Sequence, residues 1–231
     1  ETVARVAAGA IAKKLLATRG IRIVAGAVEL GGIAVPPEAC DPDAALSRPF
    51  FAAADSVVPL WEERVAAARA AGDTLGGVVQ VVARNVPAGL GEPCFDKLDA
   101  RLAYALMGVG AVKAVEVGEG FAAARLTGSQ NNDPMLPGGR FASNHVGGIS
   151  SGQDIVLRVG VKPIASIAQE QQTIDVHDQP ASVLIGGRHD LAAIPRIVPV
   201  LTAMTALVLA DALLLQERMA VLPVPDGVDW F

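Results

Sequence analysis

A run of glycine, serine and asparagine from Ser143 to Gly152 is the first stretch whose composition could serve chemistry. Its glycines allow the backbone to approach a ligand closely, and successive N–H groups could form a nest that binds an anion. A flexible loop without a ligand explains the same composition. This stretch alone therefore leaves both interpretations open.

A second stretch begins at Arg158 and continues with the run Lys162–Ser166. Here a lysine leaves a predicted strand into a proline turn with a hydroxyl group nearby. This arrangement suits contact with a phosphate or with the edge of a flavin. A strand end with a solvated lysine accounts for the pattern equally well.

A third stretch, residues 186–190, reads Gly-Gly-Arg-His-Asp and precedes Pro195 and Arg196. Arginine offers a planar fork for a carboxylate or phosphate, and Asp190 could accept a proton as a base. The alternative is a turn and helix start in which Asp190 pairs with Arg188.

Other kinds of site find little support. The three histidines, at positions 145, 177 and 189, lack the spacing of metal ligands on a helix and have no cysteine nearby, so no metal site is expected. The sequence has no nucleophile elbow, no Walker loop and no strand-linked GxGxxG pattern.

Composition narrows the class of protein. The chain has 231 residues, of which 52% are hydrophobic, so it can bury a core and is not a disordered protein. A net charge of −5 argues against a general nucleic-acid binder. Its two cysteines, Cys40 and Cys94, are too few for a disulfide framework, and a reducing, cytosol-like compartment is expected.

The elements that must position these residues follow from hydrophobic periodicity and turn residues. Helical spacing predicts helices over 2–18, from 55 or 56 to about 71, from 96 onward, and over 195–218. Alternation and β-branched content predict strands over 21–28, 78–86, 112–117, 121–126 and 153–161, with two more before 185 and a hairpin joining 112–117 to 121–126. A long loop is expected over 128–152. The fold class is α+β, in a single domain without repeats or linkers.

The ends of the sequence lead to two further expectations. The chain starts at Glu1 without methionine or signal-peptide pattern, so an upstream part of a larger protein is expected to be missing. The apolar stretch 197–210 is interrupted by Pro199, is too short for a bilayer span, and is predicted to be a buried helix.

Five motifs in order give the chain a family resemblance. They are ETVARVAAGAIAKKLL, NVPAGLGEPCFDKLDARLAYALMGVGAVKAVEVGEGF, SNHVGGISSGQDI, KPIASI and GGRHDLAAIPRIVPV. Together they closely resemble chorismate synthase from residue 1 to about Arg218. The resemblance implies a sandwich with a helical layer between antiparallel β-sheets, and residues 1–231 would be a fragment of that domain. It also implies a cytoplasmic homotetramer with no nucleic-acid or membrane partner.

The activity implied by the resemblance is a carbon–oxygen lyase acting on a phosphate. 5-Enolpyruvylshikimate 3-phosphate loses phosphate and a ring hydrogen in an anti-1,4-elimination that gives chorismate. Reduced FMN is required although there is no net redox change, and NADPH is a candidate reductant for it.

The resemblance also implies roles for individual residues. Asp190 matches a catalytic aspartate near the flavin, and Arg188 matches an arginine that contacts the cofactor and could hold anionic groups of the substrate. In the cofactor-binding segments, Ile164 and Ala165 replace two hydroxyl residues of the family, and the glycine loop is shorter than usual. The expected cofactor contacts are Gly110, Ala111, Gly147, Lys162, Pro163, Ile164, Ala165, Ser166 and Arg188.

Of the family's Arg-Ser-Ser-Ala-Arg-Glu-Thr motif, this sequence contains only the last two residues, Glu1 and Thr2. The family's catalytic histidines and several substrate-binding arginines lie upstream of this point, so none of the three histidines here is assigned such a role. The isolated chain is therefore expected to be inactive. Two alternatives remain: a non-catalytic flavin- or phosphate-binding module on the same scaffold, and a purely structural subunit.

Overall fold

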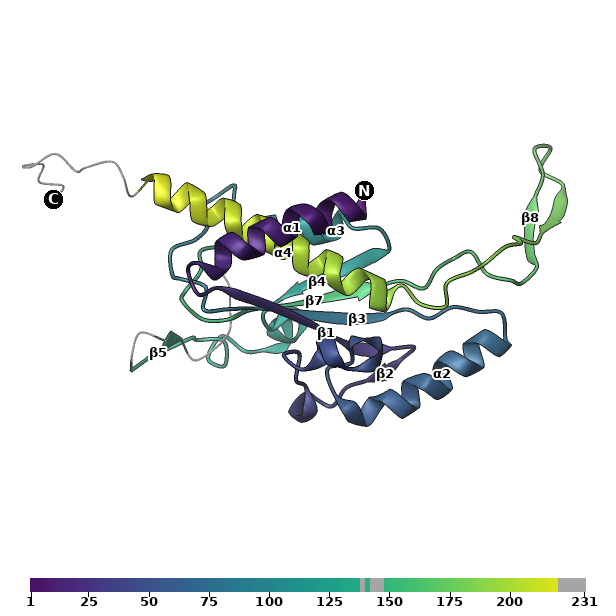
Figure 1. Cartoon of the computed structure of the whole chain (residues 1–231), viewed down its shortest axis with the longest axis horizontal. Coiled ribbons are helices and arrows are strands. Elements are labelled where there is room, and N and C mark those ends of the chain that lie inside the picture. The colour runs from purple at the N-terminus through teal and green to yellow at the C-terminus, as the bar shows by residue number, and fades with distance from the viewer. Residues whose placement is uncertain (138–139, 142–147, 220–231) are drawn as a thin grey trace, which may run out of the picture.

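A five-stranded antiparallel sheet forms the centre of the molecule (Figure 1), with the strand order β2-β1-β3-β7-β4. The computed structural model describes residues 1–137, 140–141 and 148–219. The clearest alternation is in β7, where Ile155, Leu157, Val159 and Val161 are buried and the residues between them are half-buried. The strands are β1 (Arg22–Leu30), β2 (Ile33–Ala34), β3 (Gly77–Arg84), β4 (Val112–Val117) and β7 (Ile155–Val161).

Three helices form a layer on one face of this sheet (Figure 1): α1 (Thr2–Ala17), α3 (Leu98–Met107) and α4 (Ile194–Met219). Helix α1 packs closely against α4, because a Cβ placed on Gly9 would lie 2.3 Å from the Cβ of Ala203. Glycine at this position allows the two helices to approach, at some cost in helix propensity.

Helix α4 is long and apolar enough to cross a membrane, but 72% of its most apolar 18-residue stretch is buried inside the protein. The prediction of a buried helix is confirmed. The argument that the segment is too short for a bilayer is wrong, because the helix continues through Pro199 and runs for 26 residues.

On the other side of the sheet, short 3₁₀ turns between residues 37 and 57 lead into α2 (Val58–Ala70) (Figure 1). Trp61 of α2 is fully buried, and its indole N–H donates to the carbonyl of Ile33 in β2 over 3.0 Å. The face of α2 that carries Trp61 is therefore the face that packs on the body.

Two predictions around residues 112–152 need correction. Residues 121–125 are part of a 3₁₀ helix, Gly120–Arg125, so the segment 121–126 does not form a hairpin with β4. The carboxylate of Glu116 accepts the backbone N–H of Phe121 over 3.2 Å, and this bond turns the chain away from an extended course. Within the expected loop, β5 (Met135–Leu136) pairs with β6 (Arg140–Phe141).

The two short strands expected before residue 185 are confirmed as the hairpin of β8 (Gln171–Ile174) and β9 (Pro180–Val183). This hairpin extends away from the sheet and the helical layer (Figure 1). The helices and antiparallel strands together make an α+β fold, as predicted.

Candidate functional site

An open hollow of about 210 Å³ lies where α1 begins, α3 has just ended and α4 begins. Three of the predicted site residues, Gly110, Ile164 and Asp190, line it together. They come from segments that are far apart in the sequence. We call this space the Asp190 hollow, and its lining residues are Glu1, Thr2, Val109, Gly110, Ile164, Asp190, Ala193, Arg196, Ile197 and Val200.

The turn after α3 presents Gly110 to this hollow. Ala111 adopts a left-handed conformation, with φ of 71°, and the N–H of Val112 bonds to the carbonyl of Val109. The guanidinium of Arg5 on α1 donates to the carbonyl of Gly108 over 3.1 Å. A Cβ placed on Gly110 would have no neighbour within 4 Å, so its Cα faces open space that a ligand could enter.

The segment 162–166 runs beside this turn. The N–H of Lys162 donates to the carbonyl of Ala111 over 2.9 Å, and this bond joins two of the predicted cofactor-binding segments. The side chains of Lys162, Pro163 and Ala165 are exposed and do not line the Asp190 hollow. Within the segment 162–166, Ile164 lines the Asp190 hollow.

Ser166 connects the same segment to the Gly-Gly-Arg-His-Asp stretch. Its hydroxyl lies 3.1 Å from Nδ1 of His189, and Nε2 of His189 lies 3.0 Å from the carbonyl oxygen of Ile185. A neutral ring protonated on Nε2 satisfies both hydrogen bonds, with Ser166 as the donor to Nδ1. The histidine therefore connects the outgoing and returning segments at the base of the β8–β9 hairpin.

The carboxylate of Asp190 is about one-third exposed and accepts a hydrogen bond from Nη1 of Arg196 over 2.7 Å. The pairing of Asp190 with Arg188, considered from the sequence, is therefore wrong. Arg196 was not among the predicted site residues, although it lines the hollow. Its position in the first turn of a predicted helix, shortly after Asp190, was the signal that could have identified it.

Of two further predicted residues, one lies away from the Asp190 hollow and the other is outside the described residues. Arg188 is exposed, does not line the Asp190 hollow, and makes no hydrogen bond or ion pair with the described residues. Gly147 lies outside the described residues. Across the part of the chain that the structure describes, no group of three or more His, Cys, Asp or Glu side chains could hold a metal ion.

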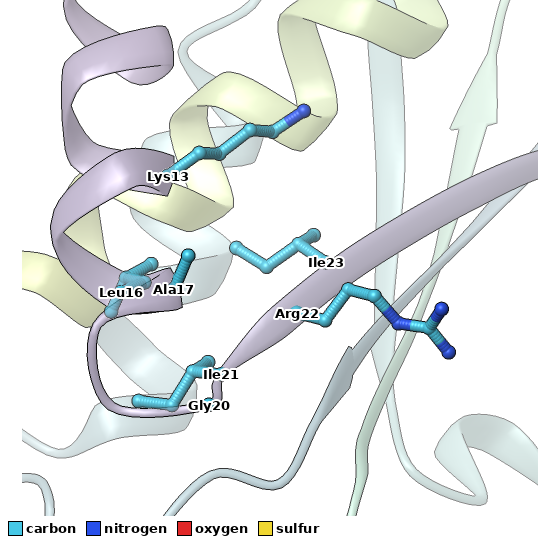
Figure 2. A pocket seen from close by; sticks show the side chains of 7 residues that line it. All are labelled: Lys13, Leu16, Ala17, Gly20, Ile21, Arg22 and Ile23. Carbon is cyan, nitrogen blue, oxygen red and sulfur yellow. The ribbon is translucent and has the colours of Figure 1, made fainter.

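A second hollow, of about 330 Å³, lies between the end of α1 and the start of β1 (Figure 2). Lys13 and Arg22 line it but extend in different directions, with Ile23 between them (Figure 2). Burial lowers the pKa of Lys13, and Arg22 pairs with Asp43 at 2.8 Å. None of the predicted site residues is here, and its cations do not converge on one point.

Comparison with known proteins decides the family. Residues 1–214 match the family model described as chorismate synthase. The chain belongs to the chorismate synthase family. The proposed resemblance is thereby confirmed.

Individual relatives agree with this assignment. The chain is 68% identical over 230 residues to a chorismate synthase of Desulfovibrio desulfuricans, covering 95% of this chain and 63% of the relative. It is 63% identical to a chorismate synthase of Nitratidesulfovibrio vulgaris (strain Miyazaki F), covering 95% and 62%. A crystal structure of chorismate synthase superposes with a TM-score of 0.76 at 33% identity, covering 94% of this chain and 63% of that one. The predicted fold class is confirmed, and the chain spans slightly less than two thirds of these relatives' length.

Proposed function

We propose that this chain is the part of a chorismate synthase that builds one wall of the flavin site. The reaction is the anti-1,4-elimination of phosphate from 5-enolpyruvylshikimate 3-phosphate, which gives chorismate. One observation supports the site above all others: Gly110, Ile164 and Asp190, matched to the family by three separate motifs, line a single hollow.

The residues present fit reduced FMN. Val109, Ile164, Ile197 and Val200 give the Asp190 hollow an apolar wall, which suits the face of a flat aromatic ring. Thr2, Asp190 and Arg196 add polar groups, as in most sites for organic cofactors. At about 210 Å³ the hollow is smaller than the roughly 300–1,000 Å³ of ordinary ligand sites, so it would hold only part of the cofactor.

The remaining cofactor contacts are proposed outside this hollow. The exposed side chains of Lys162 and Arg188 can reach anionic groups of FMN or substrate, because neither makes an ion pair with the described residues. The same proposed surface includes Ala111, Pro163, Ala165 and Ser166. Gly147 is a further proposed cofactor contact on the basis of its family motif. When bound, reduced FMN supplies electron density that eases cleavage of the carbon–oxygen bond.

Asp190 is the proposed catalytic residue of this chain. In the 1,4-elimination, the electrons of a ring C–H bond form a new double bond, the existing ring double bond shifts by one position, and phosphate leaves with the electrons of its C–O bond. The proton of the C–H bond must be accepted. Arg196 donates to Oδ2 of Asp190, and Oδ1 makes no hydrogen bond with the described residues, so we propose that Oδ1 accepts the proton. A fixed carboxylate with one free oxygen is suited to relay that proton.

The setting of the enzyme is proposed from the family. We expect a cytoplasmic homotetramer of a longer single-domain protein that acts on the small-molecule substrate alone, with NADPH as a candidate reductant of FMN. The catalytic histidines and the substrate-binding arginines of the family would be supplied by the part of the protein upstream of residue 1.

The test compares this chain with a completed protein, in which the preceding segment of the Desulfovibrio desulfuricans relative is joined to residue 1. The completed protein should form chorismate with reduced FMN under anaerobic conditions, and the chain alone should not. FMN binding without turnover by the completed protein would support the non-catalytic module instead. If the completed protein does not change the absorbance of FMN at all, the result would support the purely structural subunit.

A further inference from the structure

The two segments that flank the Asp190 hollow are the ends of one long excursion of the chain. It leaves the sheet after β7, forms the β8–β9 hairpin far from the body, and returns to α4 (Figure 1). Every residue of β8 is exposed, and a two-stranded hairpin on its own is marginally stable in water. The hairpin is thus a poor anchor, and the positions of residues 162–166 and 188–191 depend on contacts at its base.

Two adjacent residues, Thr74 and Leu75, hold both ends of this excursion. The hydroxyl of Thr74 donates to the carbonyl of Ile164 over 2.6 Å, on the outgoing side. The N–H of Leu75 donates to the carbonyl of Leu191 over 2.8 Å, on the returning side. Ile164 lines the hollow and Leu191 directly follows Asp190, so one dipeptide fixes the spacing between the two.

Thr74 is one of few buried polar residues among those the structure describes, with 8% of its surface exposed. Its backbone N–H donates to Oδ1 of Asp73 over 2.7 Å, and its hydroxyl donates to the carbonyl of Ile164. A buried hydroxyl that reaches a distant segment constrains that segment, because breaking the bond leaves a carbonyl without its donor.

The backbone of Ile164 matters more here than its side-chain chemistry. Ile164 and Ala165 carry no hydroxyl, so polar contact of these two residues with a cofactor must come from their main chain. A contact that fixes the peptide planes of Ile164 and Ala165 therefore determines how their main chain meets the cofactor. The hydroxyl of Thr74 is bonded to the carbonyl of Ile164 itself.

We propose that Thr74 is a positioning residue of the flavin site, which holds the main chain of Ile164 at the correct distance from Asp190. The inference rests on the proposed function and names a residue that lies outside the stretches singled out in the sequence. Thr74 does not line the hollow and acts through Ile164.

The experiment uses the completed protein and three variants of Thr74. Thr74→Val keeps the shape and removes the donor, Thr74→Ser keeps the donor, and Thr74→Cys replaces it with a weaker one. The matched control is Thr205→Val, because Thr205 is fully buried and its hydroxyl bonds to Leu201 within α4. FMN affinity is measured by fluorescence titration, together with the midpoint of thermal unfolding.

Thr74→Val should weaken FMN binding about tenfold, the equivalent of one lost hydrogen bond, while Thr74→Ser restores it to within about twofold. Thr205→Val should lower the melting temperature and leave FMN affinity unchanged. If Thr74→Val does not fold, Thr74→Cys must bind FMN more weakly than Thr74→Ser.

Three outcomes overturn the role of Thr74: wild-type affinity in Thr74→Val, wild-type affinity in Thr74→Cys when Thr74→Val does not fold, or an equal loss of affinity in Thr205→Val. In each of these the wild-type completed protein still binds FMN, so the proposed function stands. Failure of the wild-type completed protein to bind FMN would instead overturn the proposed function, and with it the role of Thr74.

Discussion

Arg196, in the first turn of α4, donates Nη1–H to Oδ2 of Asp190 over 2.7 Å at the edge of the Asp190 hollow. The guanidinium is largely exposed, with 65% of its side-chain surface accessible, whereas the carboxylate is only 35% exposed. Such a pair contributes little to folding because water screens it. Its consequence is geometric: one carboxylate oxygen of Asp190 is engaged by Arg196, and Oδ1 has no hydrogen bond to a described residue.

Asp190→Asn tests the proposed role of this carboxylate. The amide oxygen can still accept the hydrogen bond of Arg196, so the shape of the hollow should be kept while the base is lost. We expect kcat of the completed protein to fall by about 100-fold or more, with FMN affinity within about threefold. Asp99→Asn, a partly exposed carboxylate on α3 that does not line the hollow, is the control. Equal losses in catalysis and in FMN binding would refute the assignment.

Arg196→Gln tests whether the arginine acts through Asp190. We expect kcat to fall about tenfold, and less in Arg196→Lys, which keeps the charge but lacks the planar fork. The decisive measurement is the double variant with Asp190→Asn. It should be little slower than Asp190→Asn alone, because an interaction that acts through one partner disappears with that partner. Additive losses would mean that Arg196 acts independently of Asp190.

Much of the fold could be predicted because the signal was local. The alternation of β7 places Ile155, Leu157 and Val159 in the core, as expected for a predicted strand with one buried face. The segment 121–126 was assigned wrongly because its course depends on Glu116, a residue in the preceding strand. A hydrogen bond from a backbone N–H to a side chain earlier in the sequence leaves no periodic pattern of residues from which it could be predicted.

The site could be predicted only in part, for a similar reason. The family motifs named Gly110, Ile164 and Asp190, which do line one hollow. The partner of Asp190 was missed because Arg188, two residues away in sequence, was the nearer candidate, while the direction of α4 brings Arg196 to it. Which distant segment a buried hydroxyl such as Thr74 reaches likewise follows from tertiary packing, and sequence spacing does not reveal it.

Gly110→Val tests whether the open space beside the turn after α3 belongs to a ligand. The added side chain meets no atom of the described residues within 4 Å at its Cβ, so the unfolding midpoint should change little. FMN affinity should fall by about tenfold or more because the side chain occupies the space. Gly128→Val is the matched control, since its Cβ position is also open and it lies outside the hollow. Unchanged FMN binding in Gly110→Val would remove this turn from the site.

Glu116 gives a prediction on pH that is independent of the flavin site. Burial alone would raise the pKa of its carboxyl, but the hydrogen bonds from Arg158 and from the N–H of Phe121, with the charge of Arg158, hold that pKa below its usual value. A carboxyl whose pKa is depressed in the folded state stabilises the fold above its unfolded pKa and loses this contribution as the pH falls through its folded pKa.

Glu116→Gln should therefore lower the free energy of unfolding by about 1–2 kcal/mol at neutral pH, because it weakens the bond to Arg158, which is 2.8 Å long in the wild type. The difference between variant and wild type should shrink as the pH falls through the depressed folded-state pKa of Glu116, because the protonated carboxyl is neutral like the amide. Chemical denaturation at neutral pH and at a series of acidic pH values measures this difference. Glu38→Gln, an exposed carboxylate without a partner among the described residues, should show no such change. A difference that persists unaltered in acid would mean that Glu116 stabilises the turn by its shape and hydrogen bonds, and that its charge contributes nothing.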